Sequence, residues 1–440
     1  MFNIRKRFKV IIILLLVTSG VIFSQEKLSL TIDRAIEIGL ENSKTLHSSY
    51  MNVKSYEAKE KETDASLLPS LKLKASYKRL SEVDPFIIST PFGEFPISPS
   101  ILDNYSTQLT LSQQLFTGFR LKSQSEIAEL TSSAVKEQYN ADKSNLIYNI
   151  KNAYWSLFKA QQLKKVVDEN VDQFKAHLTD AKNMMSVGMM TNNDVLKIEV
   201  QLSDAMFRQS DAENAVQLAK VGLANVLGIS LSTDFEIASS TEINVKKYDE
   251  LNSLVEKAVE IRPEVKAADY MVKAGESNVT IAKSGWYPQL SLEGNFYYSR
   301  PNQRIVPAED KFNDTWDVGI NLNMNIWDWM TTAHKTDQAQ ASLAQSVDAL
   351  GSIKDGVTLE VTQNFLNMQQ GKNKIEISEL TVKQALENMR VTDEKFKSGL
   401  ALSSDLIDAE VALLQAKTNY TNSLVDFELS KARLEKSIGQ

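Results

Sequence analysis

Three acidic residues stand shortly after two glycines, at matching places in the chain. Gly188 is followed six residues later by Asp194, and Gly399 is followed six residues later by Asp405, with Asp408 three residues further on. Asp405 and Asp408 therefore share one face of any helix that contains them. Paired carboxylates of this kind attract cations. Each acid also suits the first turn of a helix, where the helix dipole stabilises a negative charge by a few tenths of a kcal/mol.

The rest of the sequence offers no catalytic or metal-binding set of residues. The chain has no cysteine and only three histidines, His47, His177 and His334, which lie on separate segments and which we expect to be solvated helix residues. Neither a glycine-rich phosphate loop nor a nucleophile motif is present. We therefore expect no enzyme activity, no cofactor and no metal site.

Composition narrows the class of protein. With 440 residues, 42% of them hydrophobic and 24% charged, the chain has the composition of a folded protein, and its formal charge of −7 gives no basic surface for nucleic acid. A mean hydropathy of −0.26 argues against a polytopic helical membrane protein. None of the nine prolines falls in 100–262 or 308–440, so we expect long helices there.

The amino terminus has the three parts of a secretory signal peptide. Basic residues Arg5 to Lys9 precede an apolar run from Val10 to Val17, and 18–24 ends in small residues. The alternative is a membrane anchor, but the apolar run is shorter than the roughly 20 residues that a span needs. We predict export, with cleavage after Ser24.

The sequence contains a tandem duplication. The segment 187–196 matches 398–407 at an offset of 211 residues, and Leu-Pro-x-Leu at 68–71 matches Tyr-Pro-x-Leu at 287–290 at an offset of 219. The same offset of 211 pairs Glu199 with Glu410. The predicted domains are a signal peptide at 1–24, a first helix-strand-strand-helix repeat at 25–228, an inter-repeat linker at 229–250 and a second repeat at 251–440.

Each repeat has two stretches in which apolar and polar residues alternate, which is typical of strands with one apolar and one polar face. These stretches are 71–77, 105–115, 290–296 and 317–326. Aromatic residues mark both ends of the stretches, as in outer-membrane β-barrels. A water-soluble sandwich with one wet face is the alternative. Four strands cannot close a barrel, because single-chain barrels begin at about eight strands and lipid tolerates no open edge, so membrane strands would require assembly with other copies.

The remaining segments of each repeat are predicted helices. A run without proline or glycine follows Gly118 and extends to about Met185, which corresponds to a helix of ~100 Å. The predicted helices at 32–67 and 193–224 are each about half as long, so that two of them stacked end to end match one long helix. In the second repeat the corresponding helices are 252–285, 330–397 and 404–437.

The duplicated order of elements, together with the turn motifs at 187–196 and 398–407, resembles the TolC-type outer-membrane factors of bacterial efflux pumps and type I secretion. The resemblance covers essentially all of the mature chain. It implies an α+β membrane protein with four transmembrane β-strands and long antiparallel helices per chain. It further implies a homotrimer, whose 12-stranded β-barrel is continued by a periplasmic α-helical tunnel.

The same resemblance implies a function and a set of partners. The function is that of a passive outer-membrane exit channel of a tripartite efflux pump or type I secretion system, with a large periplasmic portion. The partners are a periplasmic adaptor (membrane fusion) protein, an inner-membrane transporter and outer-membrane lipid, and nucleic acid is not among them. The hypothesis from another class is an exported coiled-coil structural or adhesion protein with a soluble β-region.

Carried onto this sequence, the resemblance also assigns roles to the residues around the two glycines. The turns would form the periplasmic tip where the adaptor docks, and the acids that follow would line the entrance gate of the channel. The predicted docking residues are Val187, Gly188, Met189, Gly399 and Leu400. The predicted gate residues are Asp194, Asp405 and Asp408.

Overall fold

The computed structural model describes residues 28–84, 87–96, 101–238, 248 and 250–439, so the predicted signal peptide lies outside the described residues. The chain divides into two compact units. The first comprises 1–43, 147–246 and 370–429, and the second comprises 44–146, 247–369 and 430–440. Each unit draws on both predicted repeats, and the domain boundaries given above stay a prediction. No helix of the described chain is long and apolar enough to cross a membrane.

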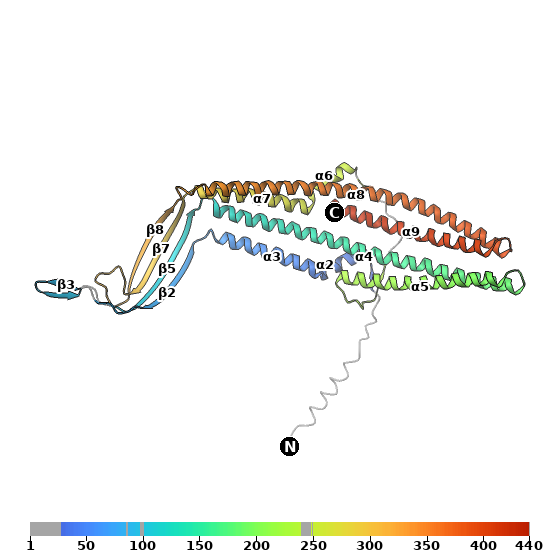
Figure 1. The fold of residues 1–440 in the computed structure, drawn as a ribbon, viewed down its shortest axis with the longest axis horizontal. Coiled ribbons are helices and arrows are strands. Elements are labelled where there is room, and N and C mark those ends of the chain that lie inside the picture. The colour runs from blue at the N-terminus through green and yellow to red at the C-terminus, as the bar shows by residue number, and fades with distance from the viewer. Residues whose placement is uncertain (1–27, 85–86, 97–100, 239–247, 249, 440) are drawn as a thin grey trace, which may run out of the picture. The chain divides into compact units, whose positions relative to one another are not determined.

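The second unit contains a four-stranded antiparallel sheet in the order β2-β5-β7-β8 (Figure 1). Its strands are β2 (Ser70–Arg79), β5 (Asp103–Phe116), β7 (Gln289–Arg300) and β8 (Asn313–Asn323). The central pair, β5 and β7, joins the two repeats. The four predicted strands are thus present, although β8 begins earlier than expected and ends before residues 324–326, which were predicted to continue it.

The two faces of this sheet differ as the alternation predicts. Leu73 of β2 and Ile320 of β8 lie on the apolar face and are strongly exposed in the single chain. On the polar face a ladder of side chains crosses three strands. Thr110 Oγ1 donates to Asn295 Oδ1 (2.8 Å), and Asn295 Nδ2 donates to Asp317 Oδ1 (3.0 Å). One face therefore suits lipid and the other suits water.

Aromatic clusters lie at both ends of the sheet. At the helical end the rings of Phe116 and Phe119 are 5.5 Å apart, and Tyr287 contacts Phe119 at 5.7 Å. At the far end Tyr77 and Tyr105 are 5.0 Å apart. Tyr297 lies at this end as well but on the polar face, where it lines a hollow together with Gln108 and Asp317.

The strand-to-helix corners of the two repeats share one backbone geometry. Gly118 and Phe119 have φ of 62° and 68°, and their counterparts Trp329 and Met330 have φ of 54° and 64°. A Cβ at Gly118 would lie 2.7 Å from the carbonyl oxygen of Ser284. This close approach is what requires glycine at that position, since Trp329 adopts the same conformation in the second repeat without being glycine.

The helices account for most of the chain. They are α2 (Ile32–Asn42), α3 (Lys44–Ala65), α4 (Arg120–Ser186), α5 (Asn192–Leu227), α6 (Leu251–Ile261), α7 (Pro263–Lys283), α8 (Thr331–Lys397) and α9 (Ser403–Ser437), with a short 3₁₀ turn η1 (Ser284–Trp286). The predicted long helices are present as α4 and α8, each of 67 residues.

The first helix of each repeat, predicted to be continuous, is broken at one residue. Ser43 separates α2 from α3, and Arg262 separates α6 from α7. Both residues are extended, with ψ of 111° and 133°. In the second repeat the cause is Pro263, because proline disfavours a helical conformation in the residue before it.

Each break meets the end of its repeat's last helix. Gly228, with φ of 68°, follows α5, and a Cβ there would lie 3.0 Å from the carbonyl oxygen of Asn42. Gly439, with φ of 77°, follows α9, and a Cβ there would lie 3.0 Å from the side chain of Ile261. The two glycines are counterparts at the offset of 211, so the duplication reproduces this close approach.

Four short strands of the described chain lie outside the predicted four-stranded sheet. In the first unit β1 (Leu28–Leu30) pairs in parallel with β6 (Phe235–Ile237), which lies in the predicted inter-repeat linker. Tyr154 Oη donates to the carbonyl oxygen of Leu30 (3.1 Å) and fixes this pair to α4. The β2–β5 loop also forms an unpredicted hairpin of β3 (Ile87–Thr90) and β4 (Gly93–Pro96).

Candidate functional site: the paired turns

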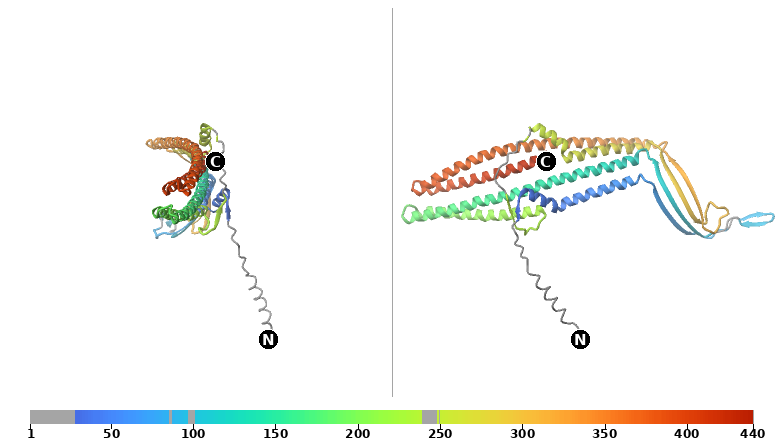
Figure 2. Two further views of the ribbon diagram at one scale, coloured as in Figure 1. Left: turned by 90° about the vertical axis from the view of Figure 1, so that its right-hand side faces the viewer. Right: turned by 180° about the vertical axis from the view of Figure 1, so that it is seen from behind.

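Two helical turns lie at the same end of the first unit, one between α4 and α5 and the other between α8 and α9 (Figure 2). Gly188 and Gly399 have φ of 80° and 73°, a left-handed conformation that glycine adopts without strain. The amide of Met189 donates to the carbonyl oxygen of Met184 (2.9 Å), which closes the first turn. Both glycines therefore do what the sequence predicts, and reverse the chain.

The turns contact one another and expose apolar side chains. A Cβ at Gly399 would lie 3.4 Å from the methyl group of Met189, which shows how near the two turns approach. Val187, Met189 and Leu400 are 69%, 62% and 79% exposed. Leu402, which the sequence analysis did not single out, is similarly exposed. We call these four residues the tip patch; exposed apolar groups of this kind mark interaction surfaces.

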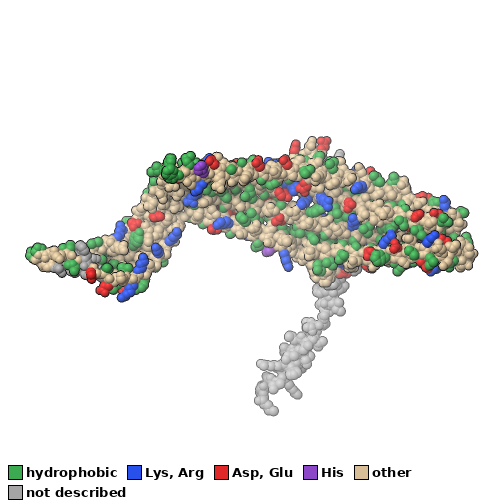
Figure 3. Space-filling view, in the orientation of Figure 1, with side chains coloured by type: hydrophobic (Ala, Val, Ile, Leu, Met, Phe, Trp, Pro, Cys, Tyr) green, Lys and Arg blue, Asp and Glu red, His purple; other side chains and the backbone are tan. Residues whose placement is uncertain are grey.

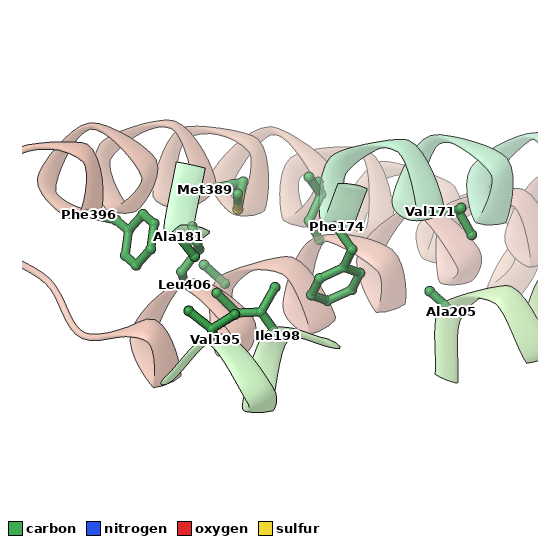
Figure 4. Close-up of a cluster of buried hydrophobic side chains, with 11 residues drawn as sticks. Val171, Phe174, Ala181, Val195, Ile198, Ala205, Met389, Phe396 and Leu406 are labelled. Carbon is green, nitrogen blue, oxygen red and sulfur yellow. The ribbon is translucent and has the colours of Figure 1, made fainter. Parts of the chain in front are cut away.

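A buried cluster beneath the turns holds them in place (Figure 4). It takes apolar side chains from all four helices. They include Phe174 of α4, Ile198 of α5, Met389 and Phe396 of α8, and Leu406 of α9. Because each helix contributes to one cluster, the positions of the turns are fixed by packing rather than by the turns themselves.

Asp194 fastens the first turn to the second. Thr191 Oγ1 donates to Asp194 Oδ2 (2.6 Å) in the first turn of α5, and Ser403 Oγ donates to Asp194 Oδ1 (3.1 Å) from the start of α9. Lys197 lies 3.6 Å from the same carboxylate. The Thr191 hydroxyl is the largest cause that holds the pKa of Asp194 below its ordinary value. This acid is therefore compensated and has a structural role.

The acids of the second repeat differ from Asp194. Asp405 and Asp408 are both exposed on α9, as their spacing predicts, and Asp405 Oδ2 accepts a hydrogen bond from the amide of Leu402 (3.0 Å). Neither has an ion pair within the described chain. The counterpart of Asp408 in the first repeat is Lys197, so only the second repeat presents two uncompensated carboxylates here.

His177 is buried, and the expectation that it is solvated is wrong. Its Nε2 lies 2.6 Å from Oε1 of Glu410, whose side chain is 0% exposed. Asn170 Nδ2 donates to the other carboxylate oxygen of Glu410 (3.2 Å), and His177 Nδ1 lies 3.8 Å from Asp393 Oδ1. A buried carboxylate is costly unless it is paired, and His177 supplies the pairing. His47 and His334 are exposed, as expected.

Comparison of the repeats explains why the histidine is needed. In the first repeat Lys182 of α4 lies 2.9 Å from Glu199 of α5, on the surface. The counterparts of this pair are Asp393 and Glu410, two acids, and His177 lies between them. The sequence alone shows that two acids, Asp393 and Glu410, replace the Lys182–Glu199 pair in the second repeat. It does not show that α4 supplies His177 between these two acids.

Among the described residues, no group of three or more histidine, cysteine or acidic side chains is arranged to hold a metal ion.

A model of one protein family, described as outer membrane efflux protein, matches residues 35–229 and 254–440. The chain belongs to this family. The match covers both repeats, and it places this outer membrane efflux protein in the outer membrane, as the sequence predicts.

Individual relatives agree with the family. Outer membrane protein TolC of Vibrio cholerae is 24% identical over 378 residues, which is 85% of this chain and 83% of TolC. The solved structure of CusC, described as forming a transmembrane channel, has a TM-score of 0.80 at 16% identity and covers 94% of this chain and 92% of its own. VceC of Vibrio cholerae has a TM-score of 0.78 at 18% identity, covering 93% and 96%. The fold predicted from the strands and helices is thus confirmed.

The His177 contact makes a testable difference between the repeats of this outer membrane efflux protein. His177→Ala should lower the free energy of unfolding by about 3–5 kcal/mol, because it leaves the Glu410 carboxylate buried without its nearest partner. Adding Glu410→Gln should recover much of that loss. The measurement is chemical denaturation of the detergent-solubilised protein.

The matched control is the surface pair of the first repeat. Lys182→Ala should cost less than about 1 kcal/mol, since Lys182 and Glu199 are exposed and screened by water. Equal losses from His177→Ala and Lys182→Ala would contradict the importance assigned to the buried contact.

Proposed function

We propose that this protein is the passive exit duct of a tripartite efflux or secretion system, formed by three copies of the chain. The observation that carries this proposal is the sheet. Its apolar face is exposed, and within the described chain β2 and β8 each pair with a strand on one side only. Lipid leaves no water to hydrogen-bond such edges, so β8 of one copy must pair with β2 of the next. Three sheets of four strands close a ring of 12.

The pairing of β8 in one copy with β2 in the next is called the joint between copies. The duplication predicts the register of this joint. Inside the chain β5, the second strand of its repeat, pairs with β7, the first strand of the other, and Leu109 lies opposite Phe296. The counterpart of Leu109 is Ile320 of β8, and the counterpart of Phe296 is Tyr77 of β2. If the joint between copies repeats the joint within the chain, Ile320 lies opposite Tyr77 of the neighbouring copy, with both on the apolar face.

This register can be tested with cysteines, because the chain has none of its own. Opposite Cβ atoms in an antiparallel pair are about 4.5–5.5 Å apart, so a chain with Tyr77→Cys and Ile320→Cys should form covalent trimers on oxidation. Denaturing gel electrophoresis of outer-membrane fractions reports the outcome. The control combines Tyr77→Cys with Leu322→Cys, which lies on the same face two residues away. Monomers alone, or better cross-linking from position 322, would contradict the register.

The tip patch is the proposed docking surface for a periplasmic adaptor protein. Val187, Met189 and Leu400 expose apolar side chains on turns that are held rigidly by the cluster beneath them, which suits repeated docking of another protein. The inner-membrane transporter that the adaptor recruits would supply the energy and select the exported molecule. The chain itself would conduct passively.

Docking is tested by cross-linking in cells. A photoactivatable label on Met189→Cys or Leu400→Cys should capture the adaptor, identified by mass spectrometry. The same label on Lys175→Cys, which is exposed on the body of α4, should not capture it. Met189→Asp with Leu400→Asp should abolish efflux without reducing the amount of trimer, because charges replace apolar contacts. Capture from position 175 but not from 189 or 400 would place docking elsewhere.

Asp405 and Asp408 are the proposed entrance gate. Three copies would bring six exposed carboxylates around one axis, a ring that favours cations and that divalent ions can bridge. Asp194 was predicted to belong to the same gate. Its contacts with Thr191, Lys197 and Ser403 also fasten the two turns together, so the gate is tested at the second-repeat pair, which has no ion pair within the described chain.

Single-channel recording in planar bilayers tests the gate. Asp405→Ala with Asp408→Ala should raise the conductance and weaken block by Mg²⁺ added from the tip side, because the carboxylates that narrow the entrance and bind the ion are gone. The control is Asp204→Ala on α5, an exposed acid that pairs with Arg208 and should leave both properties unchanged. Unchanged conductance and Mg²⁺ block in the double variant would remove the gate from this position.

A further inference from the structure

The loop between β7 and β8 folds back over the polar face of its own sheet. Asn302, which is only 3% exposed, donates through Nδ2 to the carbonyl oxygen of Asn313 (3.1 Å) and to Thr315 Oγ1 (3.3 Å). Arg304 donates through Nη1 to the carbonyl oxygen of Trp316 (3.0 Å). These contacts hold the start of the loop against β8 and direct it over the face that we assign to the channel lumen.

The base of the same loop is fastened on the opposite, apolar side. Arg300 makes two hydrogen bonds to the carboxylate of Asp310, at 2.7 and 3.0 Å. The Phe312 ring stacks on Tyr298 with centroids 5.1 Å apart and contacts Tyr105 at 5.7 Å. Because the loop is anchored on both faces of the sheet, its position over the polar face belongs to the fold.

A hollow lies between this loop and the polar face, and its charged groups are mostly cations. Lys74 and Lys78 of β2 and Arg304 of the loop line it, with Asp317 as the one acid. Asp317 already accepts a hydrogen bond from Asn295. Within the described chain, none of the three cations has a carboxylate within 4.0 Å. Figure 3 shows Lys and Arg side chains gathered along the sheet in this part of the molecule.

The other groups around the hollow are suited to binding an anion as well. Gln108 donates one of its two amide N–H groups to Asn295 Oδ1 (3.0 Å) and keeps the other, and Ser106 supplies a hydroxyl group. A carboxylate or phosphate group in the hollow would meet guanidinium and ammonium donors on two sides. Such charge-assisted hydrogen bonds are roughly twice as strong as neutral ones.

We propose that this hollow binds the anionic group, carboxylate or phosphate, of small molecules that leave through the channel. This inference rests on the proposed function, since it takes the polar face to be the lumen. Three copies would place nine cations and three acids around the outer mouth. The mouth therefore favours anions, whereas the entrance at the tip carries uncompensated acids. The sheet and the tip turns thus carry groups that select opposite charges.

Citrate, a small tricarboxylate, serves as the probe in planar bilayers that hold the full-length trimer. Added on the side of the β7–β8 loop, citrate should block the current reversibly, and added on the tip side it should block far less. Arg304→Ala should weaken the block by about tenfold or more, the factor expected when a hydrogen bond to a charged group is lost. Lys74→Gln with Lys78→Gln should do the same from the opposite wall of the hollow.

The matched control is Lys311→Ala, which removes an exposed cation of the same loop that pairs with Glu309 outside the hollow. It should leave the block unchanged. Open-channel current without citrate shows that each variant has assembled. The inference is overturned if citrate blocks wild type, Arg304→Ala and the lysine variant equally, or blocks equally from both sides. Failure of the wild-type protein to form any channel would instead overturn the proposed function.

Discussion

The unpaired backbone at the two edges of the sheet is the constraint on which the rest depends. Water would satisfy the amides and carbonyls of β2 and β8, but in the proposed contact of the apolar face with lipid each unpaired group costs several kcal/mol. On that proposal the chain completes its fold only together with other copies. The shared tip patch, the ring of entrance acids and the basic outer mouth all acquire their proposed roles through that closure.

The two repeats pair the corresponding glutamates Glu199 and Glu410 with different partners. The first uses a surface lysine, Lys182, opposite Glu199. The second has Asp393 and Glu410 at those positions and uses His177 from the first repeat between them. The second arrangement buries the Glu410 carboxylate, so it is specific in geometry and sensitive to the loss of one partner. The repeats are thus tied together by a contact that neither could make alone.

Much of this fold follows from local pattern. Alternation over about ten residues identifies the strands, and the lack of proline identifies α4 and α8. Features that depend on a single backbone dihedral or a distant partner do not follow from pattern. The extended conformation of Ser43 alone interrupts a helix, and the spacing of residues along a helix does not show that His177 contacts Glu410.

For the site, both turn glycines and the first-turn acids were predictable. The hydrogen bond from Ser403 to Asp194 and the folding of the 301–312 loop over the sheet were not predictable, because both arise from tertiary contacts.

The pairing of β5 with β7 has a consequence for the origin of the chain. If the joint between copies repeats it, the closed ring consists of six near-equal units, of which the covalent linker merely tethers pairs. An ancestor of half this length would then have built the same ring from six identical subunits. Fusion would have reduced sixfold symmetry to threefold symmetry and left alternate units free to diverge. The unlike counterparts, Lys182 with Asp393 and Lys197 with Asp408, would then record that divergence, and both lie near the turns where a partner would bind.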